Sequence, residues 1–358
     1  MTAAVGTAQD VWSEQNTSPE AIEEACRVLL RERHAANKAL APARVLNLVV
    51  IVDWDGKDAV AHRLERVGRY HASRTVLCAV QQGRDMLDAR VVMSCEPPDE
   101  QAGLGLIREE IEIDIGPEHL AQIQTIVDPV IVSELPTMVW SPDGHEEAVE
   151  ALAELTDVHL LDSGEAPEVG EAFAKALRLL RSSYVVDLAW LRTTPWRERL
   201  ASSFDPPRRR RALWEIDGVA VRHRAGASAS ALLLVGWLAS RLGWRVSPLT
   251  ASDADTVEGR ADADGRAIAV RIDPLAQEAP GLAGVTISGG ASFSLSLDRG
   301  PGGLRARGRL LTGAERSWRV LGASRGEAGI LGEGVRQALL RDPTYAPALE
   351  AASRALPR

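Results

Sequence analysis

Cysteine is scarce in this chain of 358 residues, which has three: Cys26, Cys78 and Cys95. They form no CxxC pair and leave one over from any pairing, so the sequence excludes the disulfide framework of a small secreted domain. Each is expected to be a small buried residue. Lysine is equally scarce, because 41 cationic residues include only Lys38, Lys57 and Lys175. The positive charge is therefore carried by arginine, which suits bidentate contacts with carboxylates and phosphates.

Long apolar runs are also missing. The most apolar stretch, 229–239, is about half the ~20 residues that span a bilayer. The first residues lack the basic and then apolar pattern of a signal peptide, so we expect a cytoplasmic protein that does not contact a membrane. The net charge of −9 is unfavourable for binding nucleic acid. The one compact basic run, 208–211, has no interleaved aromatic residues and is typical of a solvated linker.

The signatures of common catalytic sites are absent as well. The sequence has no P-loop, no G-x-G-x-x-G after a strand and no H-E-x-x-H among its seven histidines. Residues 322–326 fit the G-x-S-x-G elbow, but the last histidine, His223, precedes them, whereas a hydrolase of that fold needs one after the serine. Asp53 and Asp55 are typical of a turn. We therefore expect no catalytic residue, no cofactor and no metal.

The first half of the chain has the pattern of an α/β domain. Residues 45–52 form a continuous β-branched run, typical of a strand covered on both faces. Residues 75–80 and 89–95 predict further strands, and isoleucines alternate with acidic residues at the end of 104–115. Helical segments separate several of these strands. We predict a mixed sheet covered by helices in residues 1–165, with a boundary in the polar segment 162–167.

The second half, 166–358, changes character. Asp217-Gly218 and Asp264-Gly265 are two-residue hairpin signals between short strands. Residues 228–242 are apolar on nearly every side, which predicts a helix buried against a sheet. Further short strands follow, and residues 328–341 and 343–356 predict two C-terminal helices. These elements indicate an α+β domain with an antiparallel sheet.

One segment, DLAWLRTTPWR at 187–197, concentrates tryptophan and arginine, the residues that most often anchor protein interfaces. A helix start is predicted at Thr194-Pro195. An alternative stays open, in which the indoles fill the gap at a domain junction and Asp187 pairs with Arg192. The candidate partner-binding residues are listed here, the last two being weaker: Trp190, Arg192, Trp196, Arg197, His71 and Arg74.

The same segment carries a resemblance to a known family. Together with HASR at 71–74, LPTMVW at 135–140 and GWLASRLGW at 236–244, it resembles the glucose-6-phosphate dehydrogenase assembly proteins, OpcA, over about residues 44–244. Ala72 departs from the family, which commonly has proline there. The resemblance implies a two-domain, non-enzymatic partner that assembles or activates glucose-6-phosphate dehydrogenase, the NADP-reducing entry to the oxidative pentose phosphate pathway.

Two rival functions remain open at this stage. One is a sugar-phosphate sensor or enzyme with an arginine-lined pocket at the carboxyl end of the N-terminal sheet, where His71 and Arg74 would hold an anion. The other is a general scaffold without preference for this dehydrogenase. We favour the function that the family resemblance implies over both rivals. In it, the chain binds the dehydrogenase and prefers its active oligomer.

Overall fold

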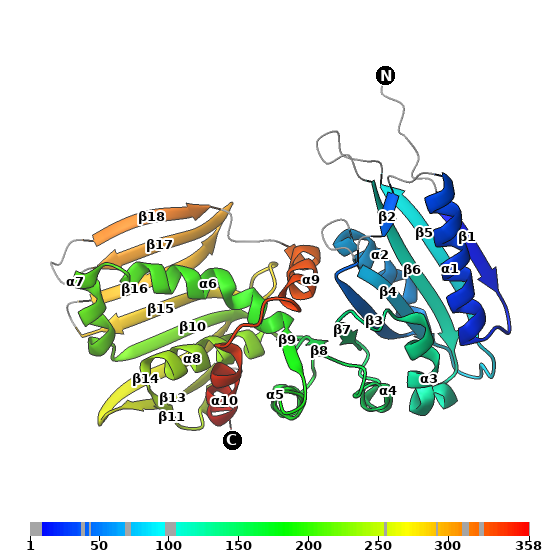
Figure 1. The fold of residues 1–358 in the computed structure, drawn as a ribbon. Helices are drawn as coiled ribbons and strands as arrows, with labels where there is room; N and C mark the ends of the chain where they lie inside the picture. Colours follow the sequence, from blue (N-terminus) through cyan, green and yellow to red (C-terminus); the bar gives the residue numbers. More distant parts are fainter. Residues whose placement is uncertain are drawn as a thin grey trace. The chain divides into compact units, whose positions relative to one another are not determined.

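The protein consists of two compact units, Met1–Leu161 and Asp162–Arg358, in a computed structural model (Figure 1). The structure describes residues 9–36, 40–42, 44–68, 73–96, 105–253, 256–290, 293–309, 315–321 and 326–357. The polar segment 162–167 belongs to the second unit, because Asp162 and Ser163 bond to side chains within that unit. Among the helices described, none has the length and hydropathy needed to cross a membrane.

The first unit is built around a mixed sheet with the strand order β1-β5-β6-β4-β3-β7-β8, and β2 pairs with β6. Its strands are β1 Gln9–Glu14, β2 Leu40–Pro42, β3 Leu46–Asp53, β4 Ser73–Val80, β5 Asp88–Glu96, β6 Gly105–Ile115, β7 Thr137–Trp140 and β8 Val158–Leu161. Its helices are α1 Pro19–Ala36, α2 Lys57–Gly68, α3 Ile123–Val127 and α4 Glu146–Ala151, with 3-10 turns at Trp54–Gly56, Pro117–Gln122 and Asp128–Val130.

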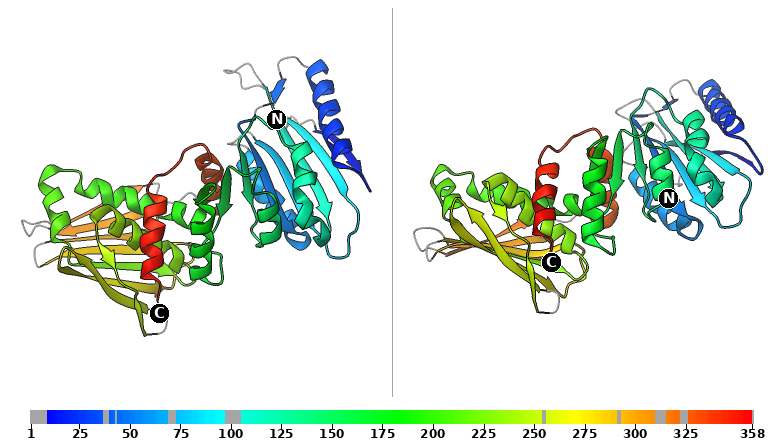
Figure 2. Two further views of the ribbon diagram at one scale, coloured as in Figure 1. Left: turned by 60° about the horizontal axis from the view of Figure 1, so that its bottom comes forward. Right: turned by 90° about the horizontal axis from the view of Figure 1, so that it is seen from below.

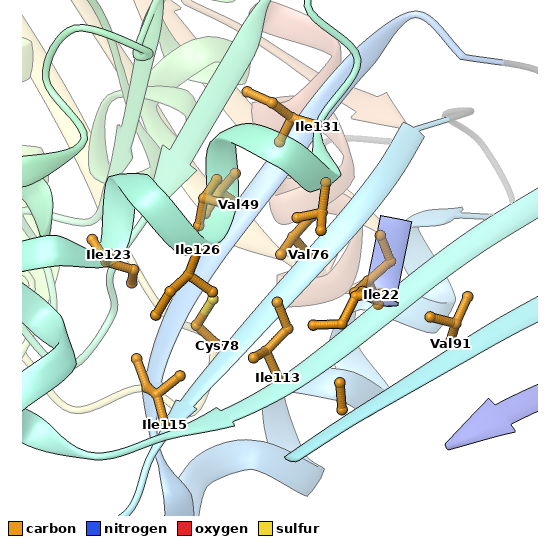
Figure 3. Packing of buried hydrophobic residues seen from close by; sticks show 14 of the residues in the cluster. Ile22, Val49, Val76, Cys78, Val91, Ile113, Ile115, Ile123, Ile126 and Ile131 are labelled. Atoms are coloured by element: carbon orange, nitrogen blue, oxygen red, sulfur yellow. The ribbon is translucent and has the colours of Figure 1, made fainter. Parts of the chain in front are cut away.

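The predicted mixed sheet is confirmed. β3, β4, β6 and β7 run parallel, whereas β5 is antiparallel to both β6 and β1. β3 is buried over nearly its whole length, as its continuous apolar run predicts. The isoleucines of β6 point into a core that Ile22 of α1 and Ile126 of α3 complete (Figure 3). The predicted helix at 117–130 is instead a short helix between two 3-10 turns, and β1 was not predicted.

The second unit contains the sheet β11-β13-β14-β10-β15-β16-β17-β18, with β12 beside β13. Its strands are β9 Tyr184–Asp187, β10 Gly218–Arg224, β11 Arg245–Val246, β12 Thr250–Asp253, β13 Thr256–Ala263, β14 Arg266–Leu275, β15 Leu282–Gly289, β16 Phe293–Gly300, β17 Gly303–Arg309 and β18 Glu315–Leu321. Its helices are α5 Val169–Leu179, α6 Leu188–Phe204, α7 Pro207–Arg210, α8 Ser228–Leu242, α9 Gly326–Gln337 and α10 Tyr345–Ala355, with a 3-10 turn at Arg211–Glu215.

This sheet is mixed, so the prediction of an antiparallel sheet is wrong. β10 and β14 pair in parallel. The buried helix α8 follows β10 and supplies part of the long connection that parallel neighbours need. The hairpin predicted at Asp217-Gly218 is also wrong, because the residues before it form a 3-10 turn. The Asp264-Gly265 hairpin is confirmed, with φ of 52° and 85° at the two turn residues.

The helices α6, α8 and α10 cover one face of the second sheet (Figures 1 and 2). That face carries the alternating apolar residues of the strands, for example Val219 and Val221 of β10. α8 and α10 approach so closely at Gly236 that a Cβ there would lie 2.1 Å from the carbonyl oxygen of Ala348. Glycine at 236 is therefore required for this helix contact.

Candidate functional site

The tryptophan segment forms the first turns of α6. This helix begins at Leu188, not at Thr194, and Pro195 lies inside it. Asp187 is the reason, since its buried carboxylate accepts a hydrogen bond from Ala189 N at 2.9 Å and caps the helix well before the Thr194-Pro195 signal. The sequence prediction missed this start because Thr-Pro resembles a helix N-terminus.

Trp190 and Arg197 form one half of a packed cluster. The Arg197 guanidinium lies 3.6 Å from the centroid of the Trp190 ring, within cation–π distance. Trp190 Nε1 donates to Asp342 Oδ2 at 2.9 Å, and Arg197 Nη1 lies 3.6 Å from the same oxygen. Tyr345 packs on Trp190 with ring centroids 5.6 Å apart. Burial lowers the pKa of Arg197 to about 10, so it stays charged at neutral pH.

Arg192 and Trp196 form the other half. Both Arg192 Nη atoms donate to the carboxylate of Asp162 at 2.7 Å, a bidentate pair. The partner expected from the sequence was Asp187, which instead bonds to Ser163 and Tyr345. Trp196 is 1% exposed, and the Arg299 guanidinium lies 5.9 Å from its ring centroid.

The four side chains of α6 are therefore packed inside the second unit, and the polar groups of Trp190, Arg192 and Arg197 are bonded within the chain. Trp190 and Trp196 are both buried, and the side chains of Arg192 and Arg197 are 8% and 11% exposed. This arrangement corresponds to the alternative that the sequence left open, in which the indoles fill the interior. Direct contact of these residues with a partner protein stays a prediction.

Asp187 joins three parts of the second unit. Its carboxylate accepts hydrogen bonds from Ser163 N at 3.1 Å, Ser163 Oγ at 2.5 Å and the hydroxyl of Tyr345 at 3.0 Å. Burial, and then the neighbouring Asp162, raise the pKa of Asp187 to about 6 from an ordinary value of 3.8. The carboxyl group therefore prefers its neutral form more strongly in the folded protein than in the unfolded chain.

The raised pKa predicts a pH dependence of stability. The folded state holds this proton up to about pH 6, whereas the unfolded chain releases it near pH 4, so the contribution of Asp187 to stability is fully present below about pH 4 and is lost as pH rises to about 6. Asp187→Asn removes this titration. Urea denaturation from pH 4 to 7 gives the free energy of unfolding at each pH. The wild type should lose stability relative to the variant between pH 4 and 6, with a difference in slope of about one proton. Equal slopes for both proteins contradict the assignment.

The second group of candidates, His71 and Arg74, has a different outcome. His71 lies outside the described residues. Arg74 lies at the amino end of β4, so its expected position at the carboxyl end of the sheet is wrong. It is buried and donates to Glu109 Oε2 and to the carbonyl of Val130, both at 2.9 Å. The Arg74 guanidinium is therefore bonded to internal partners. Glu109 also binds Arg44.

At the carboxyl ends of β3 and β7 a different trio comes together. Ligand atoms of Asp53, Asp143 and His145 lie within 4.8 Å of one another, and both aspartates are exposed. Asp143 Oδ2 accepts from Asp53 N at 2.8 Å, and His145 Nε2 lies 3.2 Å from Asp53 Oδ1. Carboxylate oxygens and imidazole nitrogens can ligate a divalent cation. Here the same groups also join two loops through their contacts with one another. Asp53 is 90 positions from Asp143 in the chain, so no sequence spacing joins the trio, and the sequence pattern pairs Asp53 with Asp55 instead.

Two cysteines have the buried positions that the sequence predicts. Cys26 lies on α1 and Cys78 on β4, and burial raises the pKa of their thiols to about 11 and about 12. Neutral thiols are poor nucleophiles, so neither is suited to catalysis. The side chain of Cys95 and residues 322–325 of the G-x-S-x-G match lie outside the described part of the chain.

Solved structures with some similarity to the chain share little sequence with it. An oxidoreductase from Sinorhizobium meliloti is 13% identical, with a TM-score of 0.46 over 86% of this chain and 94% of that one. The WlbA dehydrogenase from Thermus thermophilus is 13% identical, with a TM-score of 0.42 over 87% and 96%. Similarity at this level supports no conclusion about activity.

Two cyanobacterial relatives are closer in sequence. A protein of Synechococcus elongatus named as an OxPP cycle protein, OpcA, is 29% identical over 47% of this chain and 39% of its own length. Its namesake in Synechocystis is 26% identical over 68% of this chain and 52% of its own. The chain thus spans about half the length of these relatives, or less.

Family models match both units of the chain. Residues 64–178 match the N-terminal domain, and residues 183–349 the C-terminal domain, of a family described as the glucose-6-phosphate dehydrogenase subunit, OpcA. The two matches follow each other in order and together include most of the chain. The α6 cluster consists of Trp190, Arg192, Trp196 and Arg197 with their partners Asp162, Asp342 and Tyr345. The second match contains all of these residues except Asp162, which lies in the first. This chain therefore belongs to the OpcA family of glucose-6-phosphate dehydrogenase assembly proteins.

Proposed function

We propose that this protein is a non-catalytic factor that binds glucose-6-phosphate dehydrogenase and favours its active oligomer. The observation that carries the proposal is the ordered match of both units to the two domains of a family described as a subunit of that enzyme. The bonded state of the candidate side chains agrees with it, because Arg74, Arg192 and Arg197 are engaged within the chain and do not form an anion pocket.

A binding protein shifts an oligomerisation equilibrium only if it binds one state more tightly than the other. A tenfold shift needs a difference in binding free energy of about 1.4 kcal/mol, which a small contact area can supply. Preorganisation of the binding unit lowers the cost of association. The α6 cluster serves this purpose in the proposal, since it fixes α6 against α8 and α10 without touching the enzyme itself.

Sedimentation velocity of the purified dehydrogenase, with and without this protein, tests the proposal. We expect the enzyme to move to a larger species, and its specific activity to rise across the same titration to a plateau at a fixed ratio. Unchanged sedimentation and unchanged activity contradict the proposal. An acidic protein of similar mass and no relation serves as the control.

The same preparation also tests the rival enzyme or sensor. The protein alone, incubated with glucose 6-phosphate, should show neither turnover nor a shift in melting temperature. A thermal shift that saturates with the sugar phosphate favours the sensor instead. A pull-down from lysate that captures many proteins equally favours the general scaffold.

A further inference from the structure

The second sheet has an outer face, opposite to α6, α8 and α10, that no described helix covers (Figures 1 and 2). Strand alternation places polar and small residues there, in contrast to the apolar inner face. From β14 to β18 the register aligns these outer residues in rows across neighbouring strands.

The charges on this outer face are arranged unevenly. Near β13 and β14, Arg271 is paired with Glu258 and Asp273. In the middle, Arg222 binds Asp298 at 2.8 Å. Positive and negative groups thus neutralise one another over this part of the face.

On the outer face of β17 and β18 the arginines outnumber the acidic residues. Glu315 shares this face with four arginines: Arg305, Arg307, Arg309 and Arg319. Arg305 and Arg319 stand directly opposite each other in the antiparallel register, and both are exposed. Neither has an ion-pair partner among the residues that the structure describes. Arg307, on the same face of β17, lies 3.6 Å from Asp298, which Arg222 already occupies. Like charges directly opposite each other destabilise a sheet. Asp298 of β16 stands opposite Arg305 on its other side and offsets part of the repulsion from Arg319.

The centre of the face carries the Arg222–Asp298 pair, with short side chains beside it. Gly284 lies under the Arg222 guanidinium, where a Cβ would be 2.5 Å from Nη2. Two positions along, Ala220 of β10 faces Thr286 of β15, which in turn faces Ser296 of β16. Ala269 of β14 faces Gly218 of β10. Short side chains let a second protein reach the strands without a loss of packing.

We propose that this outer face, with Arg305, Arg307 and Arg319 at its charged end, is the surface that docks onto an acidic patch of the dehydrogenase. The inference rests on the proposed function and names the surface that performs it. Charge complementarity identifies the occupant: a basic stripe on a chain of net charge −9 attracts carboxylates. An RNA strand fits less well, because Asp298 and Glu258 lie on the same face and no aromatic residue stands among the arginines for base stacking.

Charge reversal tests the surface. Arg305→Glu places a carboxylate opposite Arg319 on one side and opposite Asp298 on the other, so the two effects offset each other and thermal stability should change little, while affinity for the dehydrogenase falls. The double variant R305E/R319E should raise the Kd by about tenfold or more, with a smaller dependence on salt than the wild type. Sedimentation or calorimetric titration at two salt concentrations measures both effects.

The matched control is R178E/R181E, which reverses two exposed arginines at the end of α5. It changes the net charge equally and should bind as the wild type does. If the wild type binds the enzyme and R305E/R319E binds equally well, the surface is wrong and the proposed function stands. If the wild type does not bind at all, the proposed function itself fails. If the wild type binds a fluorescent single-stranded RNA and R305E/R319E does not, the face binds RNA and the proposed protein partner is wrong. If the wild type self-associates and the variant does not, the face binds a second copy of this chain.

Discussion

Replacing Trp196 by alanine is expected to lower the free energy of unfolding by about 3–5 kcal/mol, the usual cost of deleting a buried tryptophan. The indole is 1% exposed and lies on α6 between α8 and β15. Its removal leaves a cavity that the surrounding helices and strands fill only in part. Urea denaturation followed by circular dichroism measures the loss.

Trp214→Ala is the matched control, because that indole is 67% exposed and its loss should change stability by about 0.5 kcal/mol or less. The experiment also decides the role that the sequence first suggested for Trp196. A W196A variant that keeps its stability and loses affinity for the dehydrogenase makes the indole a contact residue, contrary to its buried position.

The second large effect concerns Glu109 in the first unit. Glu109→Gln should destabilise this unit by about 3–5 kcal/mol, the cost of breaking a buried ion pair on one side. Glu109 is 1% exposed and binds both Arg44 and Arg74, at 2.8 and 2.9 Å through Oε2. Burial acts to raise the pKa of Glu109, but its hydrogen bonds and the charges of the two arginines lower it below the ordinary value. The glutamine variant leaves two guanidinium groups without their counter-charge.

The lowered pKa of Glu109 also predicts how the effect of E109Q on stability depends on pH. Because the folded-state pKa is lowered, the ion pair stabilises the protein at neutral pH, and its contribution is lost as pH falls below the ordinary pKa of 4.5 and acid protonates Glu109. The wild type and E109Q should therefore converge in stability at low pH. Glu23→Gln, which removes an exposed partner of Arg27 on α1, is the control and should leave the denaturation midpoint unchanged. A midpoint for E109Q equal to that of the wild type contradicts the prediction.

Much of the fold could be predicted because burial leaves a period in the sequence. The alternation of Ile111, Ile113 and Ile115 predicted a strand with one covered face, and the apolar run at 45–52 predicted a central one. The parallel pairing of β10 with β14 could not be predicted, because strand direction depends on where α8 packs and not on any local pattern. β1 is short and partly exposed, so it has no such period.

The candidate residues could be found but not interpreted from sequence alone. Enrichment in tryptophan and arginine is compatible both with an interface and with a packed internal cluster, so it does not distinguish the two. What separates the two is the presence of partners, and Asp342 and Tyr345 lie about 150 residues beyond Trp190. Pairs at this separation leave no spacing that a motif describes. The outer arginines of β17 give no signal in the sequence, because alternating arginines resemble an ordinary solvated strand.

The bond between Tyr345 and Asp187 joins residues 158 positions apart, and α10 is the element that packs most extensively on α8. During synthesis, the strands and helices of the first unit have all their internal neighbours once residue 161 has left the ribosome. The second unit has to wait for α10, and until then the apolar side of α8 is open to chaperones and to wrong partners. The two units should consequently mature at different times on the translating ribosome, and a pause ahead of α10 would lengthen the interval in which the nascent protein is vulnerable.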